Sequence, residues 1–286
     1  MRISLANCLV LLSVMALAAC ATVTPDHVAL APKVHDNLTS TEIVAPISQS
    51  EIYVYVPPSE IAQRGGGGLL LALVDAGVNN VRTAHAESAV KSLRDAVVDY
   101  DFDQTLKADL KESISQLDWM HVDGVRVVKA TSSATLDQVV SSSKNAAVLT
   151  VAADYHLSND GRELTVVLHA NLYANSAALA SSKPAGGKAD SPADPSNALY
   201  RNTFTFNAWA PGAAGERDQN IAAWSANKGA PLRAALSFGA ARLSRMVEAD
   251  LQGQEDVAGA PVDSTMHGSV VRNGDGTLEF TASAGS

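Results

Sequence analysis

Two long runs of alternating hydrophobic and polar residues lie in the middle of the chain. Ala147–Leu157 and Glu163–Tyr173 flank Ser158–Arg162, which contains the Asn, Asp and Gly residues typical of a tight turn. The pattern therefore predicts a β-hairpin. One face of the second strand is expected to lie in the core, because alternate residues on that face are apolar. These residues are Leu164, Val166, Leu168 and Leu172.

Three shorter patterns predict further strands. Glu51–Val56 alternates and stops at a pair of prolines, which cannot continue a central strand. Val125–Val128 has three valines among its four residues and predicts a short buried strand. Tyr200–Trp209 alternates once more. Together with the hairpin, these segments predict a β-sheet.

Apolar residues spaced by three and four predict helices between the strands. A long helical pattern runs from Leu69 to about Val98, after the glycines at 65–68. A second helix is expected to begin at an N-cap, Asp103, and Thr135–Ser142 predicts one or two helical turns. Pro231 is expected to begin a long last helix. The buried stripes expected on the second and last helices are Leu106, Leu110, Ile114 and Leu117, and Leu232, Leu236, Ala240, Leu243, Val247 and Leu251.

This order of elements predicts one α/β (α+β) domain. We expect a mixed sheet with a β-hairpin, packed by a long first helix and a C-terminal helix, over residues 50–252. Residues 20–49 are rich in Thr, Ser, Pro and Ala and are expected to be a flexible tether. Residues 175–197 have a similar composition and are expected to be a mobile loop. Residues 253–286 are expected to be a tail with a small hairpin around Asn273–Gly276.

The first 19 residues have the features of a secretory signal. Met1 and Arg2 precede an apolar stretch that is too short to span a bilayer stably. The stretch ends in a sequence that resembles the lipobox of bacterial lipoproteins, in which a branched residue and two small residues precede a cysteine. These residues are Leu17, Ala18, Ala19 and Cys20. The alternative is an ordinary signal peptide in which the cysteine is incidental.

The lipobox resemblance implies a location. A signal peptidase would recognise residues 17–19 and cleave before Cys20, which would carry a diacylglycerol and an N-acyl chain as its only cofactor-like groups. Two or three acyl chains hold a protein on a membrane, since each buried methylene contributes about 0.8 kcal/mol. Ala21 stands where lipoproteins of the inner membrane often have Asp. We therefore expect a protein of the bacterial envelope that is anchored to the outer membrane and faces the periplasm.

Composition and charge exclude several classes of protein. The 286 residues include 21 basic and 30 acidic side chains, a net charge of −9, which argues against nucleic acid as a partner. No apolar run reaches the length of about 20 residues that a membrane span requires. Cys8 and Cys20 are the only cysteines, so the rest of the chain can form no internal disulfide and no cysteine zinc site.

Candidate metal sites do not match known ligand patterns. Asp99, Asp101 and Asp103 suggest a calcium loop, but an EF-hand loop that begins at Asp99 would need Gly at its sixth position and Glu at its twelfth, where the chain has Gln and Leu. We interpret the segment as a solvated acidic loop that ends in a helix cap. His156 and His169 are expected to face each other across the hairpin, as a plain cross-strand pair or as a weak metal site.

The sequence contains no recognisable catalytic set. It has no G-x-S-x-G elbow, and the glycines at 65–68 lack the Lys and Ser or Thr of a phosphate loop. The apolar segment after these glycines could instead contact lipid or another subunit, and its candidate residues are Leu69, Leu70, Leu71, Leu73 and Val74. The three tryptophans are expected to anchor the core, and they are Trp119, Trp209 and Trp224.

The order of elements over about residues 50–252 resembles a small α/β module found in envelope proteins. The module occurs as the TolB amino-terminal domain, in the curli-secretion lipoprotein and in the lipoprotein activators of penicillin-binding proteins. The likeness depends on Ala147–Tyr173 and the last helix. It implies a mixed sheet packed by helices and a role in envelope assembly through protein contacts.

We therefore expect a lipid-anchored envelope protein that binds another envelope component or assembles with itself. Two alternatives belong to other classes. A lipid-anchored hydrolase would need a pocket that gathers Asp101 or Asp103 with a histidine. A carrier of lipid or another apolar ligand would need a cavity lined by the helix at Leu69–Val78.

Overall fold

The β-hairpin predicted from the alternating pattern lies at the centre of the structure, a computed structural model. Strand β4 is Ala147–Leu157 and strand β5 is Glu163–Ala174, and they pair antiparallel along their whole length. The expected core face of β5 is confirmed, because all four of its leucine and valine side chains are fully buried. The structure describes residues 26–55, 90–129, 132–184, 187–188, 190–213, 215–254 and 266–283.

Around this hairpin the described strands form one eight-stranded mixed sheet. Its order is β3-β1-β4-β5-β6-β8-β7, and β2 pairs with the far end of β4. Pairing is parallel at β1–β3, β1–β4, β2–β4 and β6–β8 and antiparallel elsewhere. The remaining strands are β1 (Thr41–Pro46), β2 (Tyr53–Val54), β3 (Val122–Val128), β6 (Ala198–Trp209), β7 (Gly268–Arg272) and β8 (Leu278–Ala282). The chain is thus an α/β domain of the expected class.

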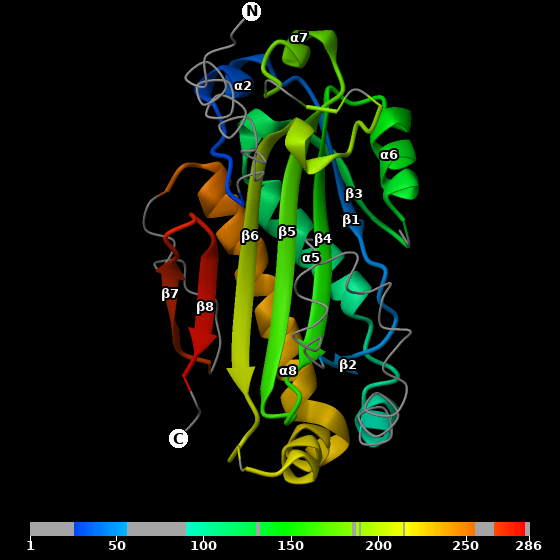
Figure 1. The fold of residues 1–286 in the computed structure, drawn as a ribbon, viewed down its shortest axis with the longest axis vertical. Coiled ribbons are helices and arrows are strands. Elements are labelled where there is room, and N and C mark those ends of the chain that lie inside the picture. The colour runs from blue at the N-terminus through cyan, green and yellow to red at the C-terminus, as the bar shows by residue number, and fades with distance from the viewer. Residues whose placement is uncertain are drawn as a thin grey trace, which may run out of the picture.

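Helices α5 (Phe102–Ile114) and α8 (Arg217–Leu251) lie together behind the sheet, as seen in Figure 1. The stripes predicted for both helices are buried, which confirms the helical spacing. The predicted N-cap of α5, Asp103, is two residues too late. The N-cap is Asp101, whose side chain accepts a hydrogen bond from the backbone N–H of Gln104. Shorter helices are α2 (Pro32–Asn37), η3 (Asp118–Met120), α6 (Ser133–Ser142), α7 (Ala177–Ala180) and η4 (Pro195–Asn197).

Most of the long first helix predicted at Leu69 to about Val98 falls outside the described residues. Residues 90–96 are helical, and their side chains Val90 and Leu93 are fully buried in the core. The predicted segment from Leu69 to residue 89 is not described. The candidate contact residues Leu69 to Val74 therefore stay a prediction.

Helix α8 consists of two parts that hold different regions of the sheet. Its backbone leaves helical geometry at residues 226–229, just before Pro231, so the last helix begins where the proline predicted it. The first part binds the turn of the central hairpin through two hydrogen bonds. Asn220 Nδ2 donates to Asp160 O at 2.9 Å, and Trp224 Nε1 donates to Gly161 O at 3.0 Å. The second part packs its apolar stripe against the core face of the sheet.

The predicted tether extends too far into the chain. Residues 41–46 lie in the interior of the sheet as β1, between β3 and β4, and Ile43, Val44 and Ala45 are fully buried. The composition of residues 20–49 as a whole concealed this short run of apolar and β-branched residues. The domain therefore begins earlier than residue 50, and Val28 already pairs with Arg201 at the edge of β6.

A side chain from the same segment completes the edge of β4. Strand β1 pairs with residues 147–150 of β4 and β2 pairs with residues 156–157, which leaves a gap between them. In this gap the Gln49 side chain acts like a short strand: Nε2 donates to Tyr155 O at 2.6 Å and Oε1 accepts from Tyr155 N at 3.1 Å.

Replacing Gln49 with alanine is expected to lower the free energy of unfolding by about 1–3 kcal/mol, because a half-buried backbone N–H and C=O would lose their partners. Gln49→Glu should also destabilise, since its carboxylate would face the Tyr155 carbonyl. Urea denaturation would measure both. Gln116→Ala is the matched control, as Gln116 is exposed and bonds only within its own helix end. Equal midpoints for Gln49→Ala and wild type would contradict the strand-like role.

The small C-terminal hairpin is confirmed, but it is part of the sheet rather than of a separate tail. Strand β8 pairs in parallel with β6, and its residues Leu278 and Phe280 enter the main core. Asp250 at the end of α8 links the helix to β6 and β7, because it accepts hydrogen bonds from Tyr200 Oη and Asn202 Nδ2 and forms an ion pair with Arg272 at 2.8 Å. The sequence of β8 did not show this pairing, since β6 lies about seventy residues earlier.

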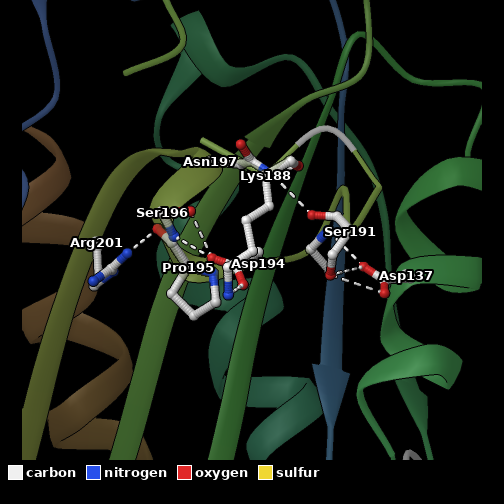
Figure 2. A network of polar contacts seen from close by, with 9 residues as sticks. Asp137, Lys188, Ser191, Asp194, Pro195, Ser196, Asn197 and Arg201 are labelled. Carbon is white, nitrogen blue, oxygen red and sulfur yellow. Dashed lines mark hydrogen bonds and ion pairs between the residues drawn. The ribbon is translucent and has the colours of Figure 1, made fainter. Parts of the chain in front are cut away.

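The segment at 175–197 is expected to be a mobile loop, but polar contacts hold described residues of its second half, from Lys188 to Asn197 (Figure 2). Asp137 of α6 accepts from Ser191 Oγ at 3.0 Å and from Ala193 N at 2.8 Å. Asp194 forms an ion pair with Lys188 at 2.7 Å and caps η4. Burial alone would raise the pKa of Asp194, but hydrogen bonds from Lys188 and Ser196 outweigh it and lower the pKa to about 2. The low apolar content was a poor guide here, because side-chain hydrogen bonds order the segment.

Two further expectations about burial need correction. The strand predicted at Val125–Val128 is longer, and it is half-exposed because β3 is an edge strand rather than an interior one. Of the tryptophans, Trp224 is 1% exposed and anchors the core, whereas Trp209 is 38% exposed. Trp119 is only partly buried and stacks on His35 of α2.

Asp109 of α5 is a partly buried carboxylate whose charge is unfavourable in the folded protein. Its Oδ2 atom is buried without a hydrogen-bond partner among the described residues. Burial, and then repulsion from Glu112, raise the pKa of Asp109 from 3.8 to about 6, although Arg245 acts in the opposite direction. Because the folded state binds this proton more tightly than the unfolded state, Asp109 favours folding below about pH 4, and the advantage is lost as the pH rises through about 6.

Asp109→Asn is therefore expected to stabilise the protein by about 1 kcal/mol at pH 7.5, a value reduced for the partial exposure of the group. The gain should disappear at about pH 4, where wild-type Asp109 is protonated. Urea denaturation at both pH values measures this difference. Asp123→Asn, at an exposed position of β3, is the control and should change neither value. A gain that does not depend on pH would contradict the assignment.

Candidate functional site

The side of the sheet opposite α5 and α8 carries polar side chains at alternating positions. In Figure 1 the β4–β6 part of this side faces the viewer, with both helices behind it. Near α7, at one end, the segment of Figure 2 and α6 cover it and enclose a small second core that includes Val44, Val148 and Tyr173. At the other end none of the described helices covers the sheet, and we call this the open end of the described sheet.

A row of hydrogen-bonding side chains crosses the open end. The strand register aligns Tyr53 of β2, His156 of β4, Thr165 of β5 and Asn207 of β6. Thr165 Oγ1 donates to Asn207 Oδ1 at 3.0 Å, and Asn207 Nδ2 donates to Glu279 Oε1 of β8 at 2.7 Å. Because adjacent strands pair side chains directly, the row is rigidly positioned by the sheet.

Asp154 holds two aromatic groups at one end of this row. Tyr53 Oη donates to both carboxylate oxygens at 3.0 and 3.1 Å, and His156 Nδ1 lies 2.8 Å from Oδ1. Burial and the nearby Asp154 raise the pKa of Tyr53, so its phenol stays protonated and donates. The His156 ring lies between Tyr53 and Tyr55, with centroid distances of 5.5 and 5.3 Å.

This arrangement fixes the histidine but does not complete a catalytic set. A carboxylate on Nδ1 selects the tautomer in which Nε2 can accept a proton or a hydrogen bond, as in hydrolase triads. A triad also needs a nucleophile bonded to Nε2. Among the described residues His156 has no such hydrogen bond, and Thr165, its neighbour on β5, bonds to Asn207 instead. Chemically, the row offers directional hydrogen bonds and an aromatic surface for binding.

Two carboxylates on the same face lack a cation. Within the described residues neither Glu163 nor Glu279 takes part in an ion pair. Burial is the main cause that raises the pKa of Glu163, and repulsion from Glu279 and Asp160 adds to it, whereas His156 partly offsets both. The open end of the sheet is therefore acidic and its charge is only partly compensated.

Exposed hydrophobic side chains gather at the same place. The described residues include four large hydrophobic side chains that are exposed, and all but Val98 are on this face. Trp209 is 38% exposed and pairs across the sheet with Glu163, and Val271 is 54% exposed and pairs with Glu279. We call this surface the distal patch, and it comprises Tyr55, His156, Glu163, Trp209, Val271 and Glu279.

The candidate sites predicted from the sequence do not include the distal patch as a whole. Leu17, Ala18, Ala19 and Cys20 lie outside the described residues, so the lipidation site stays a prediction. His156 and His169 do not face each other: His156 pairs with Thr165, and His169 pairs with Ala152 and bonds to Thr203. The hairpin register is shifted from the one that pairing of the two histidines would need. In the part of the chain described, no three metal-ligating side chains converge.

The acidic segment lines a shallow hollow of about 370 Å³ together with Ser50, Lys129 and Tyr155. Asp101 caps α5 and Asp103 forms an ion pair with Lys129, which agrees with the interpretation as a loop that ends in a helix cap. The residues that line the hollow include no histidine. The hollow therefore does not meet the requirement stated for a hydrolase.

The distal patch itself was missed at the sequence level. Asp154 and His156 occupy alternate positions of a strand whose other positions are apolar, and Thr165 and Asn207 do the same on their strands. This signal shows which residues share a face. It does not show that the face is uncovered or that Glu279 joins it, because these depend on packing between distant segments.

Comparisons with known proteins add no relative. No family model matches the chain, and no curated protein matches it. Among the described residues, no helix has both the length and the apolar character needed to cross a membrane.

Proposed function

We propose that the chain is a lipid-anchored protein of the bacterial envelope whose α/β domain faces the periplasm and binds another envelope component or assembles with itself. The lipobox-like sequence at Leu17–Cys20 supports the anchor. The observation that carries the binding role is the distal patch, which combines exposed apolar side chains with carboxylates that form no ion pair with a described lysine or arginine. Large apolar side chains exposed together on one surface are typical of interaction sites.

The corrected domain boundary supports a position close to the membrane. Val28, which pairs with β6, lies only eight residues after Cys20. Eight extended residues reach at most about 29 Å, and a flexible chain of this length spans about 16 Å on average. The anchor would thus hold the domain near the headgroups, by the end of β6 that contains Arg201.

The same geometry supports a distal patch that projects away from the membrane. Trp209 lies eight residues beyond Arg201 on β6, which corresponds to about 27 Å along the strand. A partner would therefore meet the domain at its far end. The resemblance to the TolB-type module remains part of the proposal, as that resemblance implies protein contacts.

In-cell photo-crosslinking would test this function. A photoreactive residue at Thr205, on the open face, should give discrete adducts with another protein or with a second, differently tagged copy. The same residue at Ala108, exposed on α5 on the other side of the domain, should give none. Recovering only monomers from both positions would count against the proposal.

A further inference from the structure

We propose that the distal patch binds a basic segment of another polypeptide, one that carries long cationic side chains interspersed with apolar ones. This inference names the partner class for the proposed function and rests on it.

The charge of the patch has one sign. Of the described residues that face this side of the sheet beyond His169 and Thr203, none is a lysine or an arginine, whereas Asp154, Glu163 and Glu279 are acidic. Asp154 is already satisfied by Tyr53 and His156. No described lysine or arginine pairs with Glu163 or Glu279, so these two carboxylates can attract a cation from a partner.

Each of these two carboxylates has an apolar neighbour directly across the strand pair. Trp209 lies opposite Glu163, and Val271 lies opposite Glu279. A lysine or arginine side chain suits such a pair, because its methylene stem packs on the apolar group while its head reaches the carboxylate. An arginine or lysine over the Trp209 ring would gain a cation–π contact as well.

The energetic state of Glu163 agrees with a missing partner. Its pKa is raised by burial, and the neighbouring Glu279 and Asp160 raise it further, although His156 acts in the opposite direction. An incoming cation would remove this repulsion and return the pKa toward its ordinary value. Arg162, the sequence neighbour of Glu163, forms its ion pair with Asp160, at 3.6 Å.

Two other occupants fit less well. A second copy of this chain that used the same patch would bring a second set of acidic side chains against Glu163 and Glu279, which is unfavourable for like charges in an interface. An anionic lipid surface would be repelled for the same reason. These occupants are outcomes of the test.

The inference can be tested by binding of a short labelled peptide that alternates lysine with leucine. The peptide is titrated with the whole protein at low salt. Its affinity is measured by fluorescence anisotropy. The double variant Glu163→Gln/Glu279→Gln should weaken binding about tenfold, and Trp209→Ala should weaken it about fivefold. Gln at position 279 still accepts the hydrogen bond from Asn207, so the row of side chains is preserved.

Matched controls separate the patch from general attraction. Asp36→Asn/Asp123→Asn removes two exposed carboxylates elsewhere and should change affinity less than about twofold, as should Val98→Ala at an 85% exposed site. A peptide with glutamate in place of lysine should not bind. Equal losses in both double variants, no binding of the basic peptide to wild type, or unchanged binding by Trp209→Ala would overturn the inference.

Sedimentation and vesicle flotation test the other occupants. A dimer that Trp209→Ala dissociates, or binding of the Cys20→Ala protein to anionic vesicles through the patch, would overturn the inference in favour of self-assembly or lipid. A failure of the predicted lipid anchor alone would look different. The peptide would still bind to the patch, but Cys20→Ala would not change the distribution of the protein between membrane and soluble fractions.

Discussion

Replacing Cys20 with alanine is expected to move nearly all of the protein from the membrane fraction to the soluble fraction. The expected anchor consists of acyl chains, each buried methylene of which contributes about 0.8 kcal/mol, so two chains outweigh any contact that the domain itself can make with lipid. None of the described helices offers a substitute span. Cell fractionation followed by intact-mass measurement would show the loss of both membrane association and the added mass.

Cys8→Ala is the control for this experiment. Cys8 lies inside the apolar part of the signal and follows Asn7, so it lacks the lipobox context. Its replacement should leave the location and the mass of the mature protein unchanged. A wild-type protein that is as soluble as the Cys20→Ala variant, with no added mass, would refute the envelope location and with it the proposed function.

The Trp224→Ala variant is expected to lose about 3–5 kcal/mol of its free energy of unfolding, enough to unfold much of a domain of ordinary stability. Trp224 is the largest fully buried side chain of the described residues, at 1% exposure, and its Nε1 donates to Gly161 O in the hairpin turn. Alanine would leave a cavity and an unsatisfied carbonyl between α8 and the β4–β5 turn. Urea denaturation followed by circular dichroism measures the change.

Two variants separate the causes. Trp224→Phe keeps most of the buried volume but cannot donate to Gly161, so it should cost only about 1–2 kcal/mol. Trp209→Ala removes the same type of side chain from a 38% exposed site and should cost less than about 1 kcal/mol. If Trp209→Ala destabilises the protein as much as Trp224→Ala, the division between core anchor and exposed patch is wrong.

Local patterns predicted the central elements well. The β4–β5 hairpin needs only alternation and an adjacent turn, and the stripe on the last helix needs only the helical period. These signals lie within about 25 residues of sequence, so no distant segment can change them much. The fold class followed from the same elements.

Long-range pairing accounts for most of the errors. β1 was hidden in a segment of tether-like composition, and it became a strand because β3 and β4 satisfy both of its edges. β8 pairs with β6 instead of standing apart, and Gln49 fills a gap that exists only once β1 and β2 are in place. Such contacts depend on closing long loops, and nothing in a local pattern reports them.

The candidate site divides in the same way. Composition, charge and the lipobox resemblance determined the expected address of the protein without any structure, because recognition of a signal and a cysteine depends on contiguous residues. Only the tertiary structure decided which polar face the described helices leave uncovered. It also decided which carboxylates lie beside Trp209 and Val271 on that face. Helices pack on one side of a sheet because that side carries apolar side chains. Which part of the sheet surface they leave exposed depends on the packing of the whole domain.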